Sequence, residues 1–458
     1  MDRIRELLQG QQQQPYEPLE RGDRFREDDE QTEQEEGMDK PPFVWFDYIV
    51  FFLLGVAMLW AWNMFLAAGP YFQHRFSSNE TILHNFQSAE LTISTVVNLG
   101  AMLVLAEMQA RANYPKRIIA SLGVLVVTFS LLAISTKHFL SVSAGAYFVF
   151  MMLMVGAASF GTALCQNGVF AYVTGFGREE YTQAIMTGQG LAGVLPCIFQ
   201  IVSALDLPAN EDEVAREEPN DAFRYFILAT LISLSALAAY LLLLFRYRAH
   251  PLHKTSAGSV DDLQNSQHSL LSGSVPRAPV PLLTLLRKLF WLATAVFLTF
   301  AVTMIYPIFT QEIQSVRSGT ADTPRLLQPD AFIPLAFLFW NAGDLLGRIL
   351  PAVPALSLTS HPRAVFALAA ARIVFLPLYL LCNVKGRGAV LASDAVYLVL
   401  VQLLFGLSNG FVGSTCMMGA VEYVGEDERE AAGGFMGLCL VSGLTAGSLL
   451  SFVVSWAL

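Results

Sequence analysis

The sequence predicts an all-α polytopic membrane protein, and two observations carry this prediction. Of the 458 residues, 54% are hydrophobic and only 14% are charged, and the mean hydropathy of +0.48 is well above that of a soluble domain. The apolar residues gather in eleven stretches of roughly 20, the length an α-helix needs to cross about 30 Å of hydrocarbon. We therefore expect the lipid bilayer to surround most of the chain.

The limits of the expected spans follow from the apolar runs. The spans cover 46–70, 88–110, 117–136, 146–174, 183–205, 222–247, 288–311, 331–353, 363–382, 394–420 and 431–457. Small residues at helical spacing in 188–196 and 432–451 predict faces on which helix backbones approach closely. Pro307 and Pro377 lie inside spans and predict kinks, because proline removes a backbone hydrogen bond.

Composition divides the chain into domains. Residues 1–42 contain "QQQQ" and "REDDEQTEQEE" and predict a disordered acidic cytoplasmic tail, because they hold too little apolar surface to offset chain entropy. The segment 248–286, rich in Ser, Gly and Pro, predicts a flexible cytoplasmic linker. It separates an expected N-terminal six-helix bundle, 43–247, from an expected C-terminal five-helix bundle, 287–458.

The charges in the loops predict the orientation. An odd number of spans places the two termini on opposite sides, and the excess of Lys and Arg in alternate loops puts the N-terminus in the cytoplasm. The C-terminus is then lumenal or extracellular. The sequon of Asn79, Glu80 and Thr81 lies in the first loop on the same far side, so Asn79 is a candidate glycosylation site.

The charged and thiol residues exclude several classes of ligand. The first forty residues hold thirteen acidic and six basic residues, so the net charge of −10 comes mainly from the tail. The body has no basic patch with interleaved aromatics, which argues against a nucleic-acid polymer as partner. The five cysteines are scattered singly, and the seven histidines lie in or near expected loops, so we expect no metal and no cofactor.

Polar side chains recur on one face of the eighth expected span, "FLFWNAGDLLGRIL". Asn341, Asp344 and Arg348 are spaced i, i+3 and i+7, and Phe337 extends the same face. Asn341 falls near the midplane, with Arg348 roughly 9 Å closer to the cytoplasm. Each charge alone against lipid would cost about 2.5 to 3.5 kcal/mol, so this face must turn toward protein or a watery cavity.

Two interpretations of this face remain open. The carboxylate and guanidinium form either an ion pair that locks helices together or part of a solute site. Trp62 and Asn63 in the first span, and Gln166 beside Asn167 in the fourth, supply aromatic and amide groups for a solute site. Interhelical hydrogen bonds would explain the same amides equally well.

Several of these segments together resemble the equilibrative nucleoside transporters. The resemblance is carried by Trp62 and Asn63 with the following "YF", "GQGLAG" at 188–193, "FWNAGDLLGR" at 339–348, "GLSNGFVGSTCM" at 406–417 and "AGGFMGLCLVSGLTAGSLLSF" at 432–452. It is spread over the whole membrane body. The eleven spans, the cytoplasmic tail and the long loop after the sixth span are also what that family shows.

The resemblance implies a fold, an activity and roles for residues. The fold would be major-facilitator-like, with six plus five helices around a central cavity that moves nucleosides or nucleobases by alternating access. By resemblance, Asp344 and Arg348 would contact the ribose and Gln166 the nucleobase edge. Trp62 would line the pocket and Asn341 would support it.

Further implications concern the location and the assembly. Fungal members of the family with similar acidic, Gln-rich tails lie in the vacuole, which favours a vacuolar or lysosomal-type membrane, with the plasma membrane as the other possibility. We expect a monomer. Ala61 departs from the family, which commonly has Pro before the "WN" pair.

The physics of a neutral nucleoside is compatible with such a site. Its base has a planar face that can lie against Trp62 or Phe337, and its diol can donate to Asp344 while accepting from Arg348.

Two other classes of protein are alternatives to a nucleoside carrier. A proton-coupled carrier of another small polar solute would need a titrating acid, and Glu107 and Glu422, near expected cytoplasmic helix ends, are the candidates. Asp344 is a poor candidate, because an adjacent Arg favours its ionised form. A membrane enzyme would need clustered His, a metal-binding acid pair or a nucleophile with its base, and none is found in the sequence. We therefore predict that the protein is not an enzyme.

Overall fold

The computed structural model describes residues 42–109, 112–206, 211–249, 280–318 and 323–457. Apart from residue 42, the predicted acidic tail lies outside these residues, and so does most of the predicted linker. The chain divides into two units, Met1–Phe43 and Val44–Leu458, and all the described helices belong to the second. The predicted domain boundaries therefore stay a prediction.

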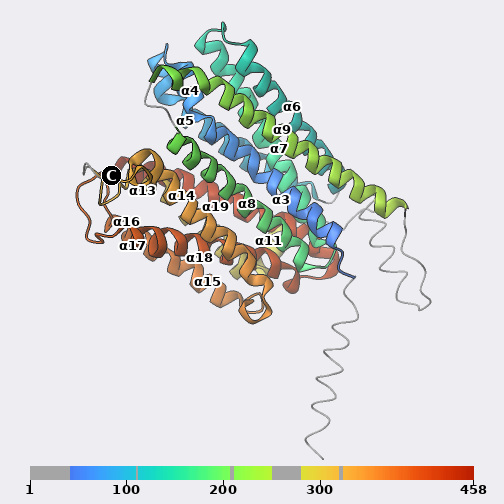
Figure 1. Cartoon of the computed structure of the whole chain (residues 1–458). Helices are drawn as coiled ribbons and strands as arrows, with labels where there is room; N and C mark the ends of the chain where they lie inside the picture. Colours follow the sequence, from blue (N-terminus) through green and yellow to red (C-terminus); the bar gives the residue numbers. More distant parts are fainter. Residues whose placement is uncertain (1–41, 110–111, 207–210, 250–279, 319–322, 458) are drawn as a thin grey trace, which may run out of the picture. The chain divides into compact units, whose positions relative to one another are not determined.

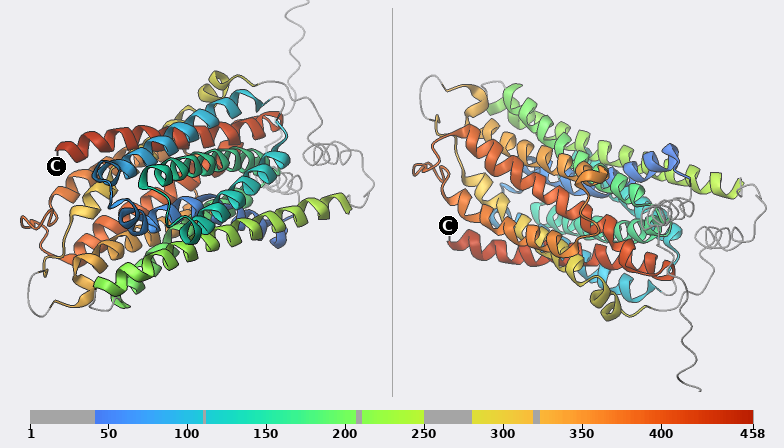
Figure 2. Two further views of the ribbon diagram at one scale, coloured as in Figure 1. Left: turned by 90° about the horizontal axis from the view of Figure 1, so that it is seen from above. Right: turned by 90° about the horizontal axis from the view of Figure 1, so that it is seen from below.

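The described residues form a nearly all-helical assembly, with helices running alongside one another (Figures 1 and 2). The first part of the chain forms α3 (Trp45–Ala67), α4 (Gly69–Phe76), α5 (Glu80–Glu107), α6 (Tyr114–His138), α7 (Ala144–Thr174), α8 (Glu179–Asp206) and α9 (Glu211–Ala249). The second part forms α11 (Leu282–Lys288), α12 (Phe290–Thr303), α13 (Tyr306–Glu312), α14 (Pro329–Ile349), α15 (Pro362–Ala371), α16 (Phe375–Leu380), α17 (Asp394–Val396), α18 (Leu404–Gly419) and α19 (Arg429–Ala457).

Eleven helical segments of the described residues are long and apolar enough to cross a membrane, which confirms the predicted number. Two helices begin much earlier than predicted. α5 begins at Glu80 rather than at 88, because the Asn79 side chain accepts a hydrogen bond from the amide of Ile82 and caps the helix eight residues earlier. α9 begins at Glu211 and includes residues 211–221, which lie between the predicted fifth and sixth spans.

Both predicted proline kinks are confirmed as breaks in the helices. α12 ends at Thr303, and α13 starts three residues later with Pro307 in its first turn. Before Pro377, a 3₁₀ turn over Arg372–Val374 separates α15 from α16. Each break lies in the turn preceding the proline, where the missing N–H removes a backbone hydrogen bond.

Glycines bring pairs of helices into backbone contact. A Cβ at Gly188 of α8 would lie 2.1 Å from the Phe52 carbonyl oxygen of α3, and one at Gly443 of α19 would lie 2.3 Å from that of Phe297 in α12. Both predicted small-residue faces are therefore packing faces. The same device joins α19 to α7, because a Cβ at Gly433 would lie 2.3 Å from the Phe170 carbonyl oxygen.

Helices from the two parts of the chain pack against each other along two seams. One seam joins α8 to α14, and the other joins α19 to α5 and α7. In Figure 1, α8, α14 and α19 lie between α6 and α9 on one side and α15 to α18 on the other. The polar face predicted on the eighth span belongs to α14 and therefore meets one of these seams.

Candidate functional site

The central feature is an ion pair on α14. Arg348 Nε donates to Asp344 Oδ2 at 2.7 Å, and the two residues are only 4% and 3% exposed. They are one helical turn apart, as the sequence predicted. The predicted burial of this face is thus confirmed, because two charges facing lipid would be far more costly than a hydrogen-bonded pair inside the protein.

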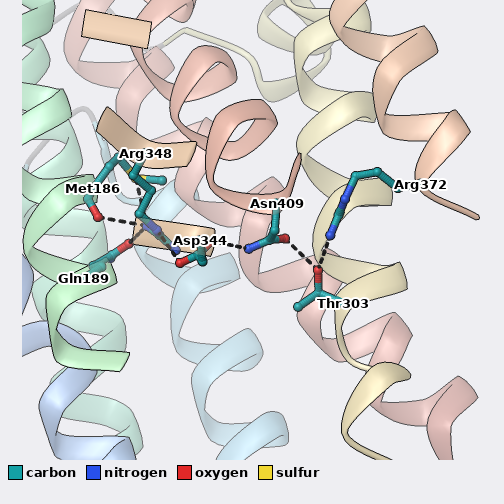
Figure 3. A network of polar contacts seen from close by, with 7 residues as sticks. All are labelled: Met186, Gln189, Thr303, Asp344, Arg348, Arg372 and Asn409. Atoms are coloured by element: carbon teal, nitrogen blue, oxygen red, sulfur yellow. Dashed lines mark hydrogen bonds and ion pairs between the residues drawn. The ribbon is translucent and has the colours of Figure 1, made fainter. Parts of the chain in front are cut away.

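The pair is linked to α8 on one side. Arg348 Nη1 donates to the Met186 carbonyl oxygen at 3.1 Å and to Gln189 Oε1 at 3.0 Å, and Figure 3 shows the guanidinium reaching toward both. Gly190, beside Gln189, leaves room for this approach, because a Cβ there would lie 3.0 Å from Arg348 Cδ. Arg348 therefore connects the fifth span to the eighth as well as pairing with Asp344.

On its other side the pair belongs to a longer polar chain. Asn409 Nδ2 of α18 donates to Asp344 Oδ1 at 2.7 Å, and Asn409 Oδ1 accepts from Thr303 Oγ1 at 2.6 Å. Arg372, only 1% exposed, donates to the same Thr303 oxygen at 3.0 Å and to the Thr299 carbonyl at 2.7 Å (Figure 3). The Asp344 carboxylate thus lies in one hydrogen-bond network with two guanidinium groups.

The breaks in two helices place members of this network. Thr303 is the last residue of α12, and Arg372 is the first residue of the 3₁₀ turn that follows α15. At such breaks the backbone diverges from a regular helix, and side chains can reach neighbouring carbonyl groups. The kinks that Pro307 and Pro377 predict therefore have a consequence for the site itself.

Asn341 lies on the same seam as Arg348. Its amide nitrogen donates to the Phe337 carbonyl oxygen at 2.9 Å and approaches Cys197 Sγ of α8 at 3.4 Å. A Cβ at Gly193 would lie only 2.2 Å from the Asn341 side-chain oxygen. Asn341 is half-buried, so it is part of the helix contact and is also partly open.

Asn63 forms an interhelical hydrogen bond, one of the two interpretations that the sequence left open. Its amide nitrogen donates to the Ala192 carbonyl oxygen of α8 at 2.7 Å. Pro196 lies four residues beyond Ala192 inside α8 and has no N–H to bond that carbonyl. Asn63 therefore replaces the hydrogen bond that the proline removes, which leaves fewer donors for a solute.

The remaining predicted site residues lie apart from the ion pair. Trp62 and Phe337 are half-buried, and the Phe337 ring packs edge-on against Tyr306 with centroids 5.9 Å apart. Gln166 is buried in α7 next to α19, where a Cβ at Gly437 would lie 4.0 Å from its Cγ. Within the described residues, neither Trp62 nor Gln166 hydrogen-bonds to Asn341, Asp344 or Arg348.

Some polar atoms of the predicted site residues are available to bind a ligand. Among the described residues, Arg348 Nη2, Asn341 Oδ1 and the Gln166 amide have no hydrogen-bond partner, and none of these atoms is fully buried. Polar groups in this state can bind a solute without first breaking a protein bond. Asp344 differs, because both of its oxygens already accept hydrogen bonds.

The sequence interpretation missed several members of the network. Gln189 and Asn409 lie in the segments "GQGLAG" and "GLSNGFVG", which were used only for packing and resemblance. Arg372 lies in the middle of the apolar ninth span and could have been found by the argument applied to Arg348. Glu107 and Glu422, the candidate proton acids, are exposed.

Asn79 lies at the exposed N-terminal end of α5, where its side-chain oxygen caps the helix. Its glycosylation stays a prediction.

Comparison with solved structures defines the class of protein. The chain is similar to the transporter FucP of the major facilitator superfamily, with a TM-score of 0.53, 14% identity and coverage of 90% of this chain and 93% of that one. It is similar to the human organic anion transporter MFSD10, with a TM-score of 0.54, 17% identity and coverage of 91% and 95%. The protein is thus a multi-pass membrane protein with a major-facilitator-like fold.

Comparison of sequences identifies the family. Residues 151–456 match the model of the nucleoside transporter family. The nucleoside transporter FUN26 of Saccharomyces cerevisiae is 30% identical over 443 residues, which cover 89% of this chain and 83% of the relative. Equilibrative nucleoside transporter 1 of Homo sapiens is 28% identical over 476 residues, covering 92% and 99%. The chain belongs to the nucleoside transporter family, a class of carriers and not of enzymes.

Proposed function

We infer that this protein carries nucleosides across a membrane by alternating access, and that nucleobases are a second class of substrate. The observation that carries this conclusion is the buried Asp344 and Arg348 pair on the seam between α8 and α14, in a chain that belongs to the nucleoside transporter family. Nucleosides are neutral and carry a diol, which a carboxylate and a guanidinium can bind together.

The ribose would meet Asp344 and Arg348 after part of the α8 contact opens. In the described conformation Arg348 Nη1 is held by Met186 and Gln189, while Nη2 has no partner among the described residues. A ribose hydroxyl can therefore start at Nη2 and replace Gln189 as α8 and α14 separate. This exchange keeps the guanidinium hydrogen-bonded in both states, which lowers the cost of moving between them.

The other predicted residues have roles that fit this pose. Gln166, with a free amide, would read the nucleobase edge, and Trp62 and Phe337 offer half-open aromatic faces for the base. Asn341 would support the ribose end. Asn63 would act indirectly, by holding the Ala192 carbonyl of α8.

The setting of the carrier is proposed on the sequence arguments. The N-terminus is cytoplasmic and the C-terminus is lumenal or extracellular. The membrane is of the vacuolar or lysosomal type, or else the plasma membrane, and the protein works as a monomer that binds no nucleic-acid polymer.

The test is uptake of labelled uridine and adenosine by purified protein in lipid vesicles. Arg348→Ala removes charge-assisted hydrogen bonds worth about 1.5 to 3 kcal/mol, so uptake should fall tenfold or more. Asp344→Asn should have a similar effect. The matched control is Arg224→Ala, which removes an arginine whose side chain is 77% exposed at the start of the sixth span and should leave uptake unchanged. Normal uptake by a well-inserted Arg348→Ala protein would discard this site.

A further inference from the structure

Glu90 is a buried acid that no step above uses. It lies in α5, is 7% exposed, and its side chain forms no hydrogen bond or ion pair with any residue that the structure describes. Its Oε1 atom is fully buried without a partner. The next turn of the same face carries Ser94, which is bonded to Ser159 of α7 at 2.9 Å, so this part of α5 faces protein.

The early start of α5 places Glu90 well away from the end of the helix. The helix begins at Glu80, so Glu90 lies about 15 Å along it, and the 28 residues of α5 span about 42 Å. If the helix is centred on about 30 Å of hydrocarbon, Glu90 lies about 9 Å inside the apolar layer. The span predicted from the sequence began at 88 and would have left this acid at the membrane surface.

No charged group of the neighbouring helices compensates Glu90 in the described residues. The titratable and charged groups of α5 and of the helices packed against it, α4, α7 and α19, are Glu80, His84, Glu107, Tyr71, His74, Arg75, Tyr147, Cys165, Tyr172, Arg429, Glu430 and Cys439. None of them bonds to Glu90. Arg75 instead donates to the carbonyl oxygens of Phe139 and Val142 and lies over the Tyr147 ring.

Asp344 provides the contrast within the same molecule. It accepts hydrogen bonds from Arg348 and Asn409, so both oxygens of this buried carboxylate have a donor. A carboxylate with no donor cannot be buried in the same way, because its charge would lose hydration and gain nothing in return. Glu90 therefore carries a proton when it is buried as described here.

We propose that Glu90 is a proton-binding site of the carrier, filled in the described conformation and emptied when the transport cycle exposes it to water. The proposal rests on the proposed function, since the cycle is that of nucleoside transport. The Glu90 carboxylate takes up one proton from water to reach the described conformation, and it returns that proton to water when it is exposed. Because the described conformation requires neutral Glu90, raising the pH disfavours it and slows a cycle that must pass through it.

The experiment measures nucleoside uptake by vesicles with the same pH on both sides, from acidic to alkaline. Wild-type uptake should fall severalfold as the pH rises. Glu90→Gln, a permanent mimic of the neutral acid, should give a flat profile. The control Glu107→Gln alters an exposed acid of the same helix and should follow the wild type. A flat wild-type profile, or a Glu90→Gln profile like that of the wild type, overturns the proposal.

A second measurement does not depend on transport. The infrared spectrum of the wild type at neutral pH should contain the carbonyl stretch of a protonated carboxyl group, and Glu90→Gln should remove it. Absence of this band, or its persistence in the variant, also overturns the proposal. If neither the wild type nor the variants transport nucleoside at any pH while the band behaves as expected, the proposed function fails and the proton site stands.

Discussion

Arg348 is the residue on which the account of the site depends most. It pairs with Asp344 on its own helix and contacts Met186 and Gln189 on α8, so it has a structural role and an available donor at once. The two interpretations of the polar face, ion pair and solute site, are therefore not exclusive. A guanidinium with several donors can hold a helix contact through one nitrogen and offer another to a ligand.

Gln166 allows a prediction about base selectivity. Gln166→Ala removes one neutral hydrogen bond to the base edge, worth about 1 kcal/mol or about fivefold in affinity. We expect the relative affinities for adenosine, guanosine and uridine to change, while the preference for ribose over deoxyribose stays the same. Competition with labelled uridine uptake measures both quantities. An equal loss for all nucleosides would argue against contact with the base.

At this scale the sequence predicts some residues and misses others for a physical reason. Asp344 and Arg348 are spaced for one helix face, so their pairing follows from the sequence. The partners Asn409, Thr303 and Gln189 come from three other helices, and no spacing rule links them. The absence of a hydrogen-bond partner for the Glu90 side chain among the described residues also depends on the neighbouring helices, and only the packed structure identifies these.

At the scale of elements, α14 and α18 form the closest contact around the site. A Cβ at Gly406 or Gly410 would lie 1.9 Å from the carbonyl oxygens of Trp340 and Asp344, respectively. In return, a Cβ at Gly343 would lie 2.1 Å from the carbonyl oxygen of Leu403, the residue before α18, and one at Gly347 would lie 2.1 Å from that of Leu407 in α18. This reciprocal pair of small-xxx-small motifs brings Asn409 within reach of Asp344.

This contact predicts a large effect for a small substitution. Gly406→Ala places a methyl group against backbone that cannot move aside, so we expect about 1 to 3 kcal/mol of destabilisation and a lower melting temperature in detergent. Gly100→Ala is the control, because a Cβ there meets nothing within 4 Å and alanine favours the helix. Equal melting temperatures for the two variants would contradict the packing argument.

The elements themselves were largely predictable, and their ends were not. Apolar length alone gave the eleven spans, because the bilayer imposes it. The early start of α5 depends on the helix cap at Asn79. From the sequence, this residue was interpreted only as a candidate glycosylation site. The prolines predicted the breaks in the seventh and ninth spans, but not the use of Thr303 and Arg372 in the polar network.

At the scale of the whole molecule, the two parts of the chain meet through seams of unequal character. The α8 and α14 seam contains the polar site, whereas Gly433 joins α19 to α7 through close backbone contact. In a major-facilitator-like carrier, alternating access requires contacts of this kind to break and re-form. The hydrogen bonds of Arg348 to α8 are suited to such exchange, because a solute can replace them.

The separation of α8 and α14 can be tested by a reversible cross-link. Asn341 Nδ2 lies 3.4 Å from Cys197 Sγ, so Asn341→Cys should form a disulfide between the two helices under oxidising conditions. A double variant with Cys197→Ser cannot form it and is the matched control. Ser94→Cys with Ser159→Cys, whose hydroxyls are 2.9 Å apart, joins α5 to α7 within the first six spans and should leave uptake intact.

Uridine uptake by the Asn341→Cys protein, measured before and after oxidation and again after reduction, tests the central claim most directly. The account predicts that oxidation stops the uptake that remains in the reduced variant, and that reduction restores it, because the ribose reaches Asp344 and Arg348 only when α8 and α14 part. Undiminished uptake by fully cross-linked protein would contradict it.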